Sequence, residues 1–167
     1  MKITLTGHRE QRLELPRDVS SAEWEDIRDW IAGRVIDNYT PKNDCVAYCG
    51  MAEGSDMAFG YVISMLKDFG YNIKLVCVCP CKNYGRKAPN YNYVIKHADK
   101  IINLHSEYVR GCDDERDEYL AKHCDLMLAI FDGIKNSGVW KTIKRARRYL
   151  KKVIIYNPKD KSVYTDS

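Results

Sequence analysis

Short apolar runs separated by segments of helical periodicity constrain the fold of this chain more than any other feature. The clearest run spans residues 125–131, and residues 73–79 are nearly as continuous in apolar side chains. Continuous apolar strands are typical of a parallel sheet that is covered on both faces. The other runs that we interpret as strands are residues 2–6, 44–49, 100–104 and 153–156.

The segments between these strands carry apolar residues at spacings of three and four, which predicts helices. One begins near Ser20 or Ser21, one at Ser55 or Asp56, and one at Asp113. Further helices are expected at residues 94–98 and 138–150. Strands that alternate with helices predict an α/β fold, a single Rossmann-like domain over residues 1–167. We expect a mostly parallel sheet of about six strands with helices on both faces, and a flexible tail at 160–167.

The composition excludes several classes of protein. The chain of 167 residues is 45% hydrophobic and 30% charged, as in a globular domain and unlike a disordered one. It has neither a long apolar run nor a signal peptide, so we expect a cytoplasmic protein with no membrane partner. Seven cysteines, an odd number, predict reduced thiols. The C-x2-C pairs of zinc sites are missing, so no metal is expected.

A glycine-rich turn follows the second predicted strand. Gly50 and Gly54 lie in the turn, and Ser55 and Asp56 precede the apolar run of the next helix. Free backbone amides and the helix dipole make such a turn suited to an anion. We therefore expect a phosphorylated small molecule here. The net charge of +4 suits an anionic ligand and does not require nucleic acid.

Two further loops are predicted at the same edge of the sheet, where ligands of open α/β folds bind. The stretch Thr6-Gly7-His8-Arg9 follows the first strand, and Arg9 is a natural partner for phosphate. Residues 132–138 connect the strand at 125–131 to the last helix. The alternative for the first of these loops is a solvated segment with an incidental arginine.

The loop at residues 80–92 also follows a strand and is a candidate lid or wall for the ligand site. Its aromatic and basic side chains could stack on a base or contact phosphate. A solvated loop is the alternative. The side chains in question are Tyr84, Arg86, Lys87, Tyr91 and, just beyond the loop, Tyr93.

Several motifs occur in the order that one known family shows. Thr6-Gly7-His8-Arg9 is similar to its TGHR or TGYR opening, and residues 50–56 to its G-x-x-x-G-x-D turn. Ser137-Gly138 with Thr142 resembles its final glycine–threonine element. Pro80, Ala98-Asp99, Tyr108, Arg116-Asp117, Asp125 and Asp132-Gly133 also follow in the same order. Over nearly its whole length, the chain thus resembles the YpsA-like branch of the SLOG superfamily.

The resemblance implies a sensor or ligand-binding protein for a nucleotide or nucleotide-derived ligand, such as ADP-ribose, an NAD derivative or a nucleoside phosphate. It implies that amides around residues 50–55 and 138–142 hold phosphates, with Arg9 and Arg116 as charged partners. Asp56 would hold a ribose hydroxyl or brace the turn. For Arg116, a surface ion pair is the alternative. Superfamily members often pair through helices that flank the sheet, so a homo-oligomer is also expected. The expected ligand-binding residues are Thr6, Gly7, His8, Arg9, Gly50, Met51, Glu53, Gly54, Ser55, Asp56, Arg116, Asp132, Gly133, Ser137, Gly138 and Thr142.

Two alternative functions follow from relatives in the superfamily. One is an enzyme that cleaves or transfers at the N-glycosidic bond of a nucleotide, as LOG-type hydrolases do. Its candidate catalytic residues here are Glu53, Asp56 and Asp132. LOG-type hydrolases carry a PGGxGTxxE motif whose Glu serves in cleavage, but Arg145 stands at the comparable position of this chain.

The other alternative is binding of single-stranded nucleic acid, by analogy with DprA. Basic residues crowd the last helix and its exit and could follow a phosphate backbone. A solvated, charged helix face explains the same pattern. The basic residues are Lys141, Lys144, Arg145, Arg147, Arg148, Lys151 and Lys152.

Overall fold

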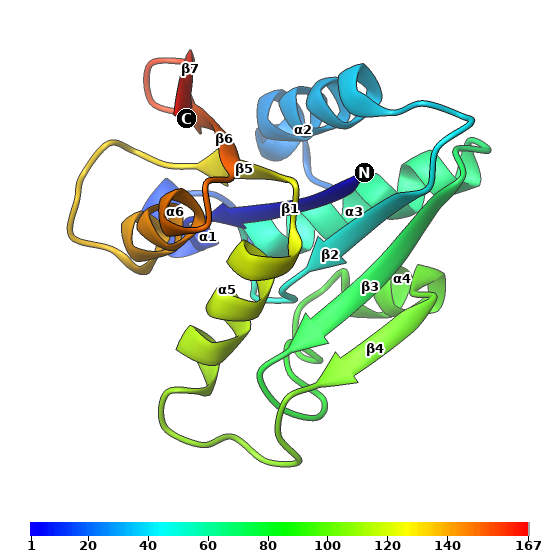
Figure 1. The fold of residues 1–167 in the computed structure, drawn as a ribbon, viewed down its shortest axis with the longest axis vertical. Helices are drawn as coiled ribbons and strands as arrows, with labels where there is room; N and C mark the ends of the chain where they lie inside the picture. The colour runs from blue at the N-terminus through cyan, green and yellow to red at the C-terminus, as the bar shows by residue number, and fades with distance from the viewer. Residues whose placement is uncertain (167) are drawn as a thin grey trace.

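The computed structural model of the protein describes residues 1–166 and contains one sheet of seven strands (Figure 1). The strand order is β4-β3-β2-β1-β5-β6-β7, and every neighbouring pair is parallel except β6 and β7. The predicted α/β class and mostly parallel sheet are therefore confirmed. The strands are β1 (Lys2–Gly7), β2 (Cys45–Cys49), β3 (Ile73–Cys79), β4 (Lys100–Asn103), β5 (Leu126–Ile130), β6 (Lys152–Asn157) and β7 (Ser162–Asp166).

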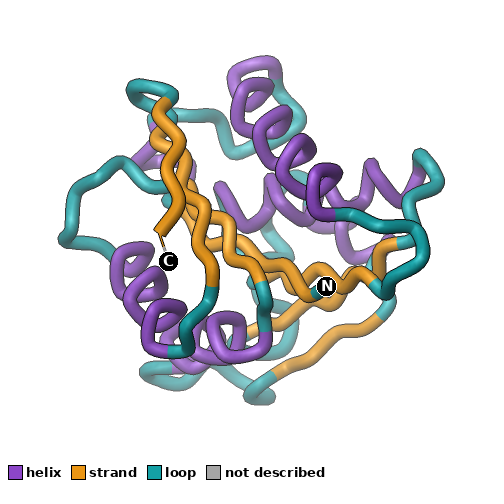
Figure 2. Tube along the Cα trace, turned by 45° about the horizontal axis from the view of Figure 1, so that its top comes forward, coloured by secondary structure: helices purple, strands orange, loops and turns teal. Residues whose placement is uncertain are grey.

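Helices cover both faces of the sheet, as predicted. On one face, α3 (Ser55–Asp68) packs against α2 (Glu25–Asn38) and α4 (Tyr91–His97). On the other face, α5 (Cys112–His123) packs against α6 (Gly138–Arg148). Figure 2 shows the strands running between these two groups of helices. Two short helices, α1 (Glu10–Leu13) and the 3-10 helix η1 (Ala22–Trp24), precede α2.

Alternating side chains of β5 show how the sheet separates two cores. Leu126, Leu128 and Ile130 belong to the larger core, which also contains residues of α2 and α3. Met127 and Ala129 point the other way and pack with residues of α5 and α6. All five residues of β5 are buried. Because apolar side chains are needed on both faces, the strand reads as one continuous apolar run in the sequence.

Two segments differ from the elements that the sequence predicts. Residues 160–166 do not form a flexible tail, because Ser162–Asp166 pairs antiparallel with β6 as a seventh strand. Residue 167 lies outside the described residues. Between Arg9 and the helix expected near Ser20 or Ser21, Glu10–Leu13 forms the short helix α1, which is not among the predicted helices. Its first residue, Glu10, is buried, and Glu14 ends it in the left-handed conformation.

The strand order places a switch point between β1 and β5. The chain proceeds from β1 through β2 and β3 to β4 on one side, then returns to β5 on the other side of β1. Parallel sheets leave a crevice beyond the carboxyl ends of the two strands at such a point, and ligands usually bind there. The loops after Gly7 and Ile130 therefore meet at the expected edge of the sheet.

All seven cysteines are buried free thiols. Burial raises the pKa of Cys77 to about 12 and that of Cys79 to about 11, so both thiols stay protonated at neutral pH.

No group of three or more His, Cys, Asp or Glu side chains within residues 1–166 is arranged to hold a metal ion. In the same range, no helix combines the length and apolar character needed to cross a membrane.

Candidate functional site

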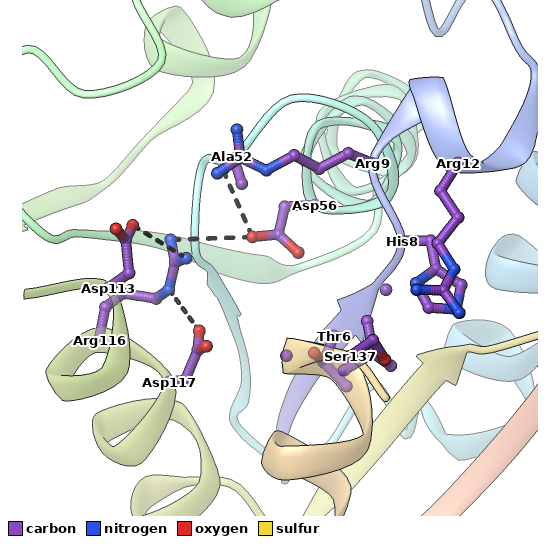
Figure 3. Close-up of a pocket in the computed structure, with 13 residues that line it drawn as sticks. Thr6, His8, Arg9, Arg12, Ala52, Asp56, Asp113, Arg116, Asp117 and Ser137 are labelled. Atoms are coloured by element: carbon purple, nitrogen blue, oxygen red, sulfur yellow. Dashed lines mark hydrogen bonds and ion pairs between the residues drawn. The ribbon is translucent and has the colours of Figure 1, made fainter. Parts of the chain in front are cut away.

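A cavity of about 480 Å³ lies at the carboxyl ends of β1 and β5, and we call it the first cavity (Figure 3). Its wall combines the loop after β1, the turn before α3, the first turns of α5 and the start of α6. The lining residues are Thr6, Gly7, His8, Arg9, Arg12, Ala52, Asp56, Asp113, Arg116, Asp117, Ser137, Gly138 and Val139.

The end of β1 is fixed against the start of α3. The His8 carbonyl accepts hydrogen bonds from the Ser55 amide at 3.2 Å and from the Ser55 hydroxyl at 2.6 Å. Gly54 has a φ of +87°, and a Cβ there would lie 2.6 Å from the Cα of Arg9. Only glycine accepts both this backbone conformation and this close approach. Gly54 and Ser55 therefore position the Thr6–Arg9 loop without lining the cavity themselves.

The glycine turn does not present the open set of amides that its sequence suggests. The Ala52 amide donates to the Asp56 carboxylate at 3.3 Å, and the Ser55 amide is taken by His8. The Gly50 carbonyl accepts from Arg116. Within residues 50–56, Ala52 and Asp56 reach the first cavity, whereas Gly50 and the buried Met51 stand behind it. The turn therefore acts mainly as a support that presents the Asp56 carboxylate.

The N-terminal end of α6 forms part of the wall of the first cavity. The Ser137 hydroxyl caps the helix by accepting from the Trp140 amide at 3.3 Å. Gly138 and Val139 line the cavity in the first turn, where backbone N–H groups have no partner inside the helix. Thr142 is fully buried and donates to the Gly138 carbonyl at 3.0 Å. Thr142 therefore stabilises the first turn and does not face the cavity.

Arg116 is deeply buried, with 4% of its surface exposed. Its Nε donates to Asp117 at 2.6 Å, and its terminal nitrogens lie 3.9 Å from Asp56 and 3.8 Å from Asp113 (Figure 3). Burial acts to lower the pKa of Arg116, but Asp117 and Asp56 outweigh it and raise the pKa further. The surface ion pair considered for Arg116 is thus wrong. Three carboxylates already surround its charge.

Arg9 carries the least compensated positive charge of the first cavity, whereas Arg12 is paired with Asp132. Figure 3 shows Arg9 extending above Asp56 toward Ala52. Its Nη2 donates to the Tyr84 hydroxyl at 2.9 Å, a neutral partner. Arg12 donates from Nε to Asp132 at 2.8 Å, and about a third of its side chain stays exposed. Within residues 1–166, the guanidinium of Arg9 is thus the one in the first cavity that no carboxylate pairs at salt-bridge distance.

Asp56 is an acid of the first cavity whose pKa is raised by its surroundings. Burial raises the pKa of Asp56 to about 6, and the nearby positive charge of Arg116 offsets only part of that effect. Asp117 adds to the rise through its negative charge. A carboxyl with a pKa near 6 changes its protonation close to neutral pH. It can accept a hydrogen bond when ionised or act as a general acid when protonated.

His8 and Asp132 form a buried pair beside the first cavity. The His8 Nε2 lies 3.1 Å from the Asp132 Oδ1, and both side chains are almost fully buried. Burial lowers the pKa of His8. Burial acts to raise the pKa of Asp132, but hydrogen bonds from Arg12 and the Ile134 amide outweigh it and hold the pKa well below its usual range. Asp132 does not line the first cavity itself and therefore acts by holding His8 and Arg12 in position.

Glu53 and Gly133 lie outside the first cavity. Gly133 follows Asp132 in a turn. Glu53 lines a neighbouring hollow of about 550 Å³, which we call the second cavity, and Arg17 binds its carboxylate at 2.6 Å. The second cavity is lined by Arg9, Glu53, Asn83, Tyr84, Gly85, Arg86, Lys87, Ala88 and Tyr108.

Sequence reasoning missed several residues of the first cavity. Arg12 lies on the unexpected helix α1, so no pattern placed it near β1. Asp113 served only to mark the start of a predicted helix, and Asp117 only as part of the ordered motifs of the family. Their spacing of four residues around Arg116 is the signal that could have placed all three on one helix face. Ala52 and Val139 have no distinguishing chemistry in the sequence.

The basic side chains of α6 form a separate patch of paired charges. Lys141, Lys144, Arg145, Arg147 and Arg148 surround a shallow hollow of about 470 Å³. Arg145 binds Asp114 at 2.8 Å and lies 3.3 Å from Glu118, both on α5. Arg148 also contacts Glu118, at 3.4 Å. Much of the arginine charge is thus neutralised within the fold.

No known protein-family model matches this chain, and no curated protein sequence matches it either. The likeness to the YpsA-like branch therefore rests on the motifs quoted above.

Proposed function

We propose that this protein binds a nucleotide or a nucleotide-derived ligand in the first cavity, as a sensor or ligand-binding protein. Membership of the YpsA-like branch of the SLOG superfamily is part of the proposal. The observation that carries it is the pairing, in one cavity of about 480 Å³, of anion-binding groups with the buried carboxylate of Asp56 and the partly exposed carboxylates of Asp113 and Asp117. Pockets of roughly 300–1,000 Å³ are typical of small-ligand sites.

The anion-binding groups suit a phosphate. The amides of Gly138 and Val139 lie at the positive end of the α6 dipole, which favours negative charge. Arg9 and Arg12 reach the same cavity from the loop after β1 and from α1. A phosphate at this position would gain charge-assisted hydrogen bonds from both elements.

The carboxylates suit sugar hydroxyls. Asp56, Asp113 and Asp117 line the side of the first cavity that faces α3 and α5. Ionised carboxylates only accept hydrogen bonds, and ribose hydroxyls can donate them. A bare polyanion would be repelled by these acids. A ligand that joins phosphate to ribose uses both halves of the cavity, which is why we favour a nucleotide over an inorganic anion.

Titration calorimetry with AMP, ADP-ribose, NAD and ribose 5-phosphate tests the proposal. Arg9→Ala should weaken binding of the best nucleotide by about tenfold or more, because a hydrogen bond to a charged group contributes about 1.5–3 kcal/mol. Arg34→Ala is the matched control, since Arg34 lies on α2 and pairs with Asp37 away from the site. The proposal fails if none of these compounds binds the wild-type protein, or if both variants bind as the wild type does.

A second candidate function is cleavage of a nucleotide N-glycosidic bond. Among the acids Glu53, Asp56 and Asp132, Asp56 alone lines the first cavity, and its pKa of about 6 suits a general acid near neutral pH. The bond between the anomeric carbon and the base would break as Asp56 donates its proton to the departing base. Water would form the new bond to that carbon, and the proton that the water loses would return to Asp56. Incubation with nucleoside monophosphates and NAD, followed by chromatography for free base or nicotinamide, tests this candidate. Turnover that Asp56→Asn abolishes would establish it, and no release of base would exclude it for these substrates.

A further inference from the structure

We propose that the second cavity binds the nucleobase of the ligand whose sugar and phosphate occupy the first cavity. This inference rests on the proposed function and names the part of the protein that would hold the base. The two cavities share Arg9, which lines both. A ligand that extends past Arg9 would therefore pass from one cavity directly into the other.

Two tyrosines connect the cavities through their hydroxyl groups. Tyr84 accepts from Arg9 at 2.9 Å, and Tyr108 donates to Asp113 at 2.6 Å. Arg9 and Asp113 line the first cavity, whereas the two tyrosines line the second. Each hydroxyl thus anchors an aromatic ring at a fixed position relative to the expected phosphate and ribose site.

The rings themselves suit a planar heterocycle. The guanidinium carbon of Arg116 lies 5.6 Å from the centre of the Tyr84 ring, so a cation packs near Tyr84 from the first cavity. Tyr108 is 61% exposed even though its hydroxyl is bound. An anchored but uncovered aromatic ring is a surface on which a base can stack, and base–aromatic stacking tolerates any base.

The loop that forms the second cavity is held in place before any ligand arrives. Arg17 donates to the Lys87 carbonyl at 2.9 Å, and the Asn90 side chain accepts from the Val19 amide at 2.9 Å. At Gly85 the loop lies directly on the glycine turn, because a Cβ there would be 2.4 Å from the Met51 carbonyl oxygen. Preorganised loops lose little entropy on binding, so a base contact can contribute to affinity.

The charge of the second cavity also fits a base attached to a phosphate. Arg9, Arg86 and Lys87 are positive, and the negative Glu53 is paired with Arg17. The surroundings therefore favour an anionic ligand as a whole. They do not place a free carboxylate where it would repel the phosphate on its way into the first cavity.

Calorimetry with AMP and ribose 5-phosphate measures the contribution of the base, since AMP carries adenine where ribose 5-phosphate carries its anomeric hydroxyl. We expect wild-type protein to bind AMP about tenfold or more tightly than ribose 5-phosphate. Tyr108→Leu and Tyr108→Phe both lose the bond to Asp113, so we expect the two variants to bind ribose 5-phosphate with equal affinity. Tyr108→Leu also removes the ring and should abolish most of the difference between AMP and ribose 5-phosphate. Tyr108→Phe keeps the ring and should retain most of that difference.

The outcomes separate this inference from the proposed function. Equal binding of both compounds by wild type would overturn the base site but leave the sugar–phosphate site standing. Tyr108→Leu that weakens both compounds equally would also overturn it, because the ring would then support the fold and not the base. If neither compound binds, both the inference and the proposed function fall.

Discussion

Asp56→Asn tests the electrostatics of the first cavity through the pH dependence of stability. Burial raises the pKa of Asp56 from its ordinary value of 3.8 to about 6 in the folded protein. The folded state then holds the Asp56 proton more tightly than the unfolded state does. The associated cost to stability is absent below pH 3.8, grows as pH rises, and is complete above about pH 6.

The size of the effect follows from the two pKa values. A shift of one pKa unit corresponds to about 1.36 kcal/mol, so a fully ionised Asp56 lowers the free energy of unfolding by about 3 kcal/mol. Evaluated at single pH values, the cost is about 1.6 kcal/mol at pH 5 and about 3 kcal/mol at pH 8. Asparagine cannot ionise. The stability of Asp56→Asn relative to wild type should therefore rise by about 1.4 kcal/mol between pH 5 and pH 8.

Urea unfolding followed by tryptophan fluorescence, at pH 5, 6.5 and 8, measures this difference. Comparing the two proteins at each pH cancels the titration of groups that do not interact with Asp56. The change in their stability difference between pH 5 and pH 8 then cancels any pH-independent effect of the substitution. Asp29→Asn, at an exposed position of α2, is the control and should follow wild type at every pH. Parallel stability curves for wild type and Asp56→Asn would refute the perturbed carboxyl.

Two further predictions concern residues that support the first cavity. Gly54→Ala should lower the free energy of unfolding by about 2 kcal/mol or more in urea titrations. The residue has a positive φ, and the added Cβ would lie 2.6 Å from the Cα of Arg9. Gly111→Ala, at the same φ of +87° but with nothing within 4 Å, should lose clearly less, and equal losses would contradict the close approach. Thr142→Val removes the bond to the Gly138 carbonyl and should cost about 1 kcal/mol of stability. Its nucleotide affinity in calorimetry should change less than about twofold, and a tenfold loss would instead place Thr142 on the ligand.

The parts of the fold that are buried on both faces could be predicted from the sequence. β3 was expected at residues 73–79 and is found at Ile73–Cys79, because each of its faces needs apolar side chains. β7 could not be predicted for the opposite reason. Its residues are almost all exposed at the edge of the sheet, so neither alternation nor an apolar run marks Ser162–Asp166. The four residues of α1 are too few to show a helical period.

The site could be predicted only as far as local sequence determines it. That the loops after β1 and β5 meet follows from parallel topology, and Arg9 and Gly138 do line one cavity. The partner of each polar group depends on tertiary contacts instead. Ser55 donates to His8, 47 positions away in the chain, and Arg116 reaches Gly50 across 66 positions. Because of these contacts, the glycine turn that was expected to bind phosphate instead holds neighbouring residues in place. No motif in the sequence indicates these contacts.

The partial compensation of Asp56 links the binding and hydrolysis proposals. Arg116 is shared among Asp56, Asp113 and Asp117, and the closest of its three ion pairs is with Asp117. Asp56 is the buried carboxyl of the three, and its burial raises its pKa to about 6 despite the charge of Arg116. A ribose hydroxyl that donates to Asp56 would stabilise its ionised form and lower its pKa, because a hydrogen bond to the charged state favours that state. A pure binder would therefore gain affinity as pH rises through 6, whereas an enzyme that uses Asp56 as a general acid would lose activity over the same range. The direction of the pH dependence around one residue thus discriminates between the two functions.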